Sequence, residues 1–167
     1  WAVERCGDLG LYDRGTSLHV SQDIVMHAPM PRSARLSSRA RVAAVQDRGK
    51  ATIVEIEVGC AVFSATYAIF LPGIGGWGGP APVAAPPAPA GLAEAASFRT
   101  SREQAALYRM TGDLHPVHVD PVVAAGYGFE RPILHGLCTF GIALRMLGAV
   151  AGCHPAELRA ASARLSA

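Results

Sequence analysis

A tract rich in glycine, proline and alanine at residues 73–98 constrains the fold of this chain more than any other feature. Proline lacks a backbone N–H and breaks helices and central strands, and sequence rich in glycine and proline holds neither element well. We therefore interpret the tract as a linker. It separates an N-terminal part, residues 1–72, from a C-terminal part, residues 99–167.

The N-terminal part shows the alternation of apolar and polar residues that is typical of β-strands with one buried face. The apolar positions share one parity at Leu18, Val20, Ile24, Met26, Leu36, Ala40, Val42 and Ala44. Asp47–Lys50 predicts a turn, after which Thr52–Val58 and Val62–Leu71 continue the β pattern around a break at Gly59. We expect an antiparallel meander over residues 17–71.

The C-terminal part has a helical pattern instead. Ser101 and Gln104 predict a capping box at the start of one helix. Asp120 is a preferred N-cap residue and Pro121 suits the first helical position, so a short helix is expected there. Residues 133–150 carry apolar residues at helical spacing with small residues between them, which predicts a largely buried helix with close neighbours.

Composition excludes several classes of function. The chain is 50% hydrophobic and 17% charged with a formal charge of +2, which argues for a globular protein without the dense basic face that nucleic acids require. No apolar run approaches the roughly 20 residues that span a bilayer, so no membrane partner is expected. Cys6, Cys60, Cys138 and Cys153 form no C-x-x-C pair, which favours neither a zinc cage nor a disulfide framework and predicts a reducing cytoplasm.

Gly73–Gly78 matches the dinucleotide-binding pattern G-x-G-x-x-G and follows a predicted strand. That motif works by placing a pyrophosphate on the N-terminus of the next helix. Proline follows here in place of a helix. We therefore interpret the segment as a loop.

The stretch Gly112–Asp120 concentrates two histidines and two carboxylates between two predicted helices. Three interpretations are open. His115 and His118 with Asp113 or Asp120 are candidate metal ligands, although their spacing matches no compact zinc signature. The two aspartates are alternatively simple caps of helix ends. The third interpretation is acid–base catalysis, in which Asp113 and His118 hold one water between them.

Two residues further along bear on the catalytic interpretation. The backbone N–H of Gly136, at the start of the predicted long helix, is available for a developing negative oxygen, as an oxyanion site demands. His135 beside it has no evident catalytic partner in the sequence. We interpret it as a packed structural histidine whose ring nitrogens bond backbone groups.

Four segments resemble a known family. Ala106–Pro121 and Gly128–Gly141 are similar to the (R)-specific enoyl-CoA hydratases of the hydratase-2, MaoC-like family. Gln46–Lys50 and Gly73–Pro80 resemble the end of the non-catalytic first half, and the link onward, in the family members that have two halves.

The resemblance implies an α+β hot-dog fold, a long helix packed on a curved antiparallel sheet, here as an incomplete double hot dog. Residues 1–72 would be the C-terminal strands of a non-catalytic half, and residues 99–167 the helical N-terminal part of a catalytic half. The implied activity is (R)-specific hydration of a trans-2-enoyl-CoA, or the reverse dehydration, in fatty-acyl, sterol or polyketide metabolism. The implied substrate is an acyl-CoA or acyl-carrier thioester. We expect a homo- or hetero-oligomer and neither a metal nor another cofactor.

The family pattern makes Asp113 and His118 the acid–base pair and the Gly136 amide the oxyanion donor. It normally has asparagine where this chain has His115, at a site that positions the water and substrate. The chain is also shorter than a two-half member, as if truncated at both ends. One alternative is therefore a catalytically impaired hot-dog remnant that acts as a binding or partner subunit. A hot-dog thioesterase is another, which the Asp113–His118 loop resembles less closely.

Overall fold

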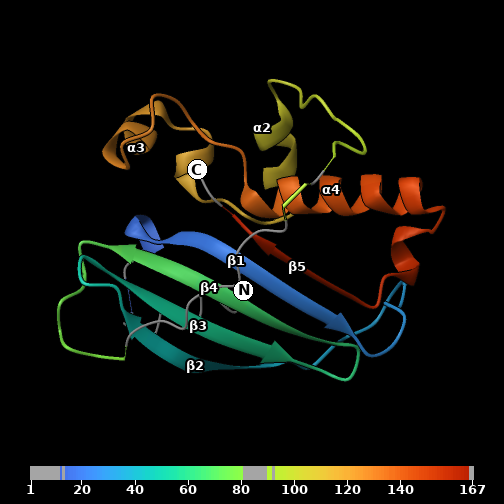
Figure 1. Cartoon of the computed structure of the whole chain (residues 1–167), viewed down its shortest axis with the longest axis horizontal. Coiled ribbons are helices and arrows are strands. Elements are labelled where there is room, and N and C mark those ends of the chain that lie inside the picture. The colour runs from blue at the N-terminus through green and yellow to red at the C-terminus, as the bar shows by residue number, and fades with distance from the viewer. Residues whose placement is uncertain (1–11, 13, 81–89, 92, 166–167) are drawn as a thin grey trace. The chain divides into compact units, whose positions relative to one another are not determined.

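The structure of the protein is a computed structural model that describes Tyr12 and residues 14–80, 90–91 and 93–165 (Figure 1). The described residues form two compact units. One lies within residues 1–92 and 156–167, and the other lies within residues 93–155.

The first unit is a five-stranded antiparallel sheet in the order β2-β3-β4-β1-β5. Its strands are β1 (Leu18–Met26), β2 (Arg39–Asp47), β3 (Ala51–Gly59), β4 (Phe63–Pro72) and β5 (Ala160–Arg164). The first four follow the alternation seen in the sequence. In β3, for example, Val54, Ile56 and Val58 are all buried, and they form a core cluster with Ile69 and Leu71 of β4.

Two features of the sheet differ from the expected meander. Strands β2, β3 and β4 do form a meander, but β1 pairs with β4 and not with β2. The alternation of apolar and polar residues determines which face of a strand is buried, but it does not determine which other strand pairs with it. The second difference is β5, which pairs with β1 and was not predicted (Figure 1). Its sequence, Ala-Ala-Ser-Ala-Arg, lacks the β-branched and aromatic residues that identify strands.

The first residues of the predicted linker are held on the β2–β3 hairpin. The Asp47 carboxylate accepts hydrogen bonds from the N–H groups of Gly49, Gly76 and Gly78, each at 2.8 Å. These bonds, with that from Gly76 the largest contribution, lower the pKa of Asp47. Because a carboxylate already occupies glycine N–H groups that a phosphate would need, the contacts favour the loop interpretation of Gly73–Gly78.

The remainder of the tract is only partly described. Residues 90–91 and 93–98 contain no helix or strand, in agreement with the sequence, whereas residues 81–89 and 92 lie outside the described part of the chain. The division of the chain at residues 72 and 99 remains a prediction.

The second unit is helical. It contains α2 (Gln104–Arg109), a 3-10 helix (Pro116–His118), α3 (Pro121–Gly126) and α4 (Gly136–Ala151). The predicted cap of α3 is confirmed, since Asp120 Oδ1 accepts from the N–H of Val122 at 2.8 Å. The predicted capping box is wrong: the N-cap of α2 is Glu103, without a side-chain bond, and Ser101 contacts Gln104 only through backbone atoms.

Helix α4 begins at Gly136, three residues later than the apolar pattern suggested, and ends before Gly152, whose φ of 68° is left-handed. The expectation that it is largely buried is wrong, because only Cys138 and Gly148 among its residues are buried. At 100° per residue Leu147 lies opposite Cys138, and its side chain is 58% exposed. Apolar residues on every side of the helix therefore do not mean burial on every side.

No helix among the described residues is both long and apolar enough to cross a membrane. Cys60, Cys138 and Cys153 are free thiols, and Cys6 lies outside the described residues.

Candidate active site

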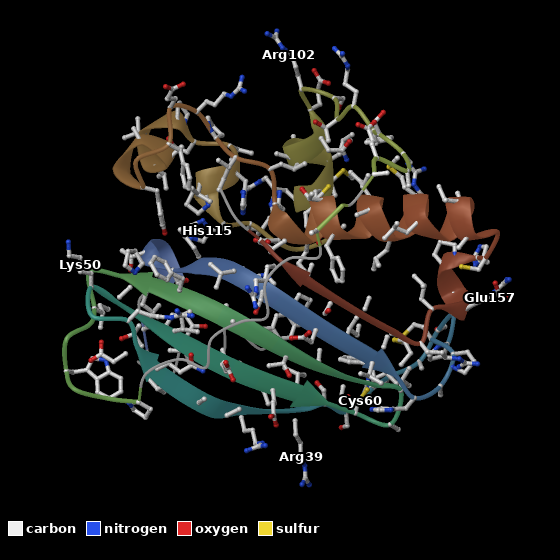
Figure 2. All side chains as sticks on the ribbon, viewed as in Figure 1. Arg39, Lys50, Cys60, Arg102, His115 and Glu157 are labelled. Carbon is white, nitrogen blue, oxygen red and sulfur yellow. The ribbon has the colours of Figure 1, made fainter. Side chains whose placement is uncertain are left out.

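The segment between α2 and α3 is held by the helix before it and by a buried residue of its own. Arg109, in the last turn of α2, donates from Nη1 to the carbonyls of Leu114 at 2.8 Å and His115 at 3.3 Å (His115 is labelled in Figure 2). Val117, in the 3-10 helix that follows, is 1% exposed and anchors the segment from inside. The loop therefore presents its polar side chains from a fixed backbone.

His118 has a defined proton position. Its Nδ1 lies 2.9 Å from the carbonyl oxygen of Ile133. A carbonyl only accepts, so in the neutral ring Nδ1 carries the hydrogen and Nε2 is left as an acceptor. Burial lowers the pKa of His118 to about 4, against the opposing effect of the Ile133 bond. At neutral pH the ring is uncharged and able to accept a proton at Nε2.

Asp113 lies beside His118. A carboxylate oxygen of Asp113 and a ring nitrogen of His118 are within 4.8 Å of each other, and the Asp113 side chain is exposed. Its Oδ1 also accepts from the N–H of His115 at 3.3 Å. Since a hydrogen bond to water is about 2.8 Å long, one water can bond to both groups at this separation. The structure therefore brings together the two residues that the sequence predicted as an acid–base pair.

His135 lies against the same pair. Its side chain is 1% exposed, and its ring stacks on that of His118 with centroids 3.6 Å apart and planes at 26°. Its Nε2 is 3.2 Å from the backbone oxygen of Asp113, whereas its Nδ1 has no hydrogen-bond partner among the residues that the structure describes. Burial lowers the pKa of His135 as well. The sequence predicts a packed histidine whose ring nitrogens both bond backbone groups. The ring is packed, and one of its two nitrogens, Nε2, bonds a backbone group.

His115 belongs to the same loop and makes a different set of contacts. Its Nδ1 accepts from the N–H of Val117 at 3.2 Å, which caps the 3-10 helix and leaves the hydrogen of the neutral ring on Nε2. That Nε2 is 3.4 Å from the hydroxyl of Tyr127, the C-cap residue of α3. The ring lies 6.0 Å from that of His118 and nearly perpendicular to it. No pattern in the sequence points to Tyr127 as a neighbour of His115.

A metal interpretation fits this arrangement poorly. Among the described residues, the group with ligand spacing is Asp113, His118 and His135, whereas the sequence suggested His115 and His118 with Asp113 or Asp120. Histidine binds a metal along a lone pair in the plane of its ring. Two rings stacked at 26° have lone pairs that run nearly side by side, so they do not converge on one ion.

Gly136 opens helix α4, where the first N–H groups have no acceptor within the helix. The N-cap residue His135 makes no side-chain bond to them. His115 provides a contrast, because it has almost the same φ and ψ and does cap its helix with Nδ1. The His135 ring contacts His118 and Asp113 instead, and no described residue accepts from the N–H of Gly136, the next residue in the chain.

The lowered pKa of His118 predicts a loss of stability in mild acid. The unfolded chain binds this proton near pH 6.5 and the folded chain only near pH 4, so the unfolded state holds more protons between these values. The free energy of unfolding should therefore fall as pH drops through this window. After a discount for partial exposure, we expect a loss of about 1 kcal/mol between pH 7 and 5. Urea titrations should show a smaller loss in His118→Asn, and an equal loss would contradict the assignment.

Comparison with known proteins gives consistent results. The MaoC like domain family matches residues 87–167. The chain is 40% identical over 157 residues to 3-hydroxyacyl-thioester dehydratase Y of Mycobacterium tuberculosis, covering 86% of this chain and 54% of that protein. It is 37% identical over 155 residues to peroxisomal enoyl-CoA hydratase 2 of Arabidopsis thaliana, covering 81% and 50%. The chain thus spans about half the length of these two relatives.

Solved structures agree on the fold. Full-length peroxisomal multifunctional enzyme type 2 from Drosophila melanogaster superimposes with a TM-score of 0.77 at 34% identity, covering 90% of this chain and 29% of that one. The five-stranded antiparallel sheet and the long helix are the elements of the hot-dog fold, which confirms the predicted α+β class. The chain belongs to the MaoC-like dehydratase and hydratase 2 family, homologous to the hydratase domains of peroxisomal multifunctional enzyme type 2 and to enoyl-CoA hydratase 2.

Proposed function

We propose that this chain adds water across the double bond of a trans-2-enoyl thioester to give the (R)-3-hydroxyacyl thioester, or catalyses the reverse dehydration. Its homology to enoyl-CoA hydratases and 3-hydroxyacyl-thioester dehydratases supports this class of reaction. The observation that carries the proposal is the Asp113 and His118 pair within 4.8 Å, with the His118 ring neutral and its Nε2 free to accept a proton.

In the proposed reaction, one water lies between Asp113 and His118. As its oxygen bonds to the β-carbon, the pair takes up a proton, and a proton from the pair is delivered to the α-carbon. One hydroxyl and one proton are added, so the two residues return to their starting states. Charge that builds on the thioester oxygen is stabilised by the N–H of Gly136 at the start of α4.

The test is an assay of the purified chain with a trans-2-enoyl-CoA. Disappearance of the conjugated thioester with formation of the 3-hydroxyacyl product would support the proposal, and chiral analysis should give the (R) alcohol. The (S) alcohol would refute the stereochemical assignment. Release of free CoA thiol would indicate a thioesterase, whereas binding of the thioester without turnover would indicate the impaired remnant.

Replacement of His115 by asparagine should preserve or raise the hydration rate. Asparagine is a preferred N-cap residue, so its Oδ1 can accept from Val117 N–H as His115 Nδ1 does, and its amide can donate on the other side. The measurement is the pH–rate profile of the parent and His115→Asn proteins. A large loss of kcat in a folded variant would show that His115 instead carries a proton.

The proposal includes both coenzyme A and a carrier protein as carriers of the acyl group. The expected oligomer and the cytoplasmic location stay predictions.

A further inference from the structure

We propose that His135 is a positioning residue that holds both members of the acid–base pair, Asp113 through its ring N–H and His118 through its ring face. The kinetic part of this inference rests on the proposed function. Its structural part is independent of any reaction, because the two contacts can be measured in the absence of substrate.

The two contacts come from different parts of one side chain. The Nε2 of His135 is 3.2 Å from the Asp113 backbone oxygen, and the ring face lies 3.6 Å from that of His118. Tyr108 of α2 packs on the same ring at a centroid distance of 4.7 Å. His135 is 1% exposed, so neither contact is open to free rotation in solvent. One side chain therefore links a loop residue to a residue of the 3-10 helix.

The first contact determines which nitrogen of the His135 ring carries the hydrogen. The Asp113 carbonyl only accepts, so Nε2 carries the hydrogen and Nδ1 is unprotonated. Within the described part of the chain that Nδ1 has no partner, and an unpaired buried acceptor destabilises a protein. Packing alone would be served better by an apolar ring such as phenylalanine. We infer that the Nε2–H to the Asp113 carbonyl is the reason for a histidine here.

The positioning role also requires that the His135 ring is uncharged. The titratable or charged neighbours of the two stacked rings are Asp113, Arg109, His115 and Tyr108. A second positive charge at 3.6 Å would oppose protonation of His118 during turnover, whereas the neutral His135 ring does so only weakly. Burial keeps His135 neutral and so lets the stack act as a support.

Two variants separate the contacts. His135→Phe keeps a ring against His118 and removes the donor to Asp113. His135→Gln keeps an amide donor at a similar reach and removes the ring face. We expect kcat to fall by roughly 10- to 100-fold in each, with KM changed by less than about threefold, because positioning acts on the reacting groups.

The nuclear magnetic resonance titration of His118 gives a readout that simple destabilisation would not move. In His135→Gln the exposed face of His118 should take up water, and the pKa of His118 should rise from about 4 toward its ordinary value. In His135→Phe that pKa should stay low. Matched controls are His19→Phe and His19→Gln, since His19 also bonds a backbone carbonyl, that of Ser21, and packs on an aromatic ring.

The inference fails if both variants keep parental kcat, or if the His118 pKa is the same in parent and His135→Gln. Nitrogen-15 spectra of the parent provide a test that needs no variant: they should show the Nε2–H tautomer of His135, and the Nδ1–H tautomer would overturn the inference. A parent without hydratase activity would refute the proposed function, while the titrations and the tautomer would still decide the positioning role.

Discussion

Replacement of Asp113 or His118 by alanine should lower the rate of enoyl-CoA hydration by at least roughly 100-fold, the largest effects we expect in this chain. Each change removes one of the two groups that exchange protons with the water between them. Neither should unfold the protein, because Asp113 is exposed and His118 is only partly buried. The measurement is kcat/KM on a trans-2-enoyl-CoA, with circular dichroism as a check of folding.

More conservative variants sharpen this test. Asp113→Asn keeps an oxygen that can accept from His115 N–H but cannot take up a proton at neutral pH. His118→Asn keeps a donor near the Ile133 carbonyl and lacks Nε2. Asp120→Asn is the matched control, since asparagine caps helices as well as aspartate does. Equal activity in Asp113→Asn and the parent would remove Asp113 from the mechanism.

The strands show what a local sequence pattern can predict and what it cannot. The alternation of apolar and polar residues located β1 to β4 because each strand has one buried face. Gly49, at positive φ, lies in the turn between β2 and β3. Which strands pair is a different matter. The choice of β4 as partner of β1, and the addition of β5 from residues more than 130 positions away, depend on chain contacts that no short window contains.

The candidate site shows the same limit, since residues close together in the chain can be related from the sequence and distant residues cannot. The proximity of Asp113 to His118 and the helix cap at Asp120 could be predicted from the sequence because these residues lie within one loop, whereas the acid–base role of the pair stays a prediction. His135 has no evident catalytic partner in the sequence, because 17 positions separate it from His118 and periodicity says nothing about ring stacking. The capping box at Ser101 is wrong because the N-cap of α2 lies two residues later, at Glu103, and a short pattern locates the end of a helix only to within a few residues.

Removal of the Gly136 N–H tests the oxyanion assignment with little change elsewhere. Gly136→Pro deletes only this donor from the backbone, and proline is favoured at the first position of a helix. The preceding residue must be extended, and His135 already is, with φ −57° and ψ 130°. Helix α4 should therefore form normally in the variant.

We expect kcat of Gly136→Pro to fall by about 100-fold, the typical effect of losing one donor to a developing oxyanion. Gly136→Ala is the control, because it adds a methyl group and keeps the N–H, and its kcat should stay within about threefold of the parent. The comparison separates the hydrogen bond from the steric effect of a side chain at this position. Equal kcat values for the proline and alanine variants, with α4 intact by circular dichroism, would mean that another donor binds the thioester oxygen.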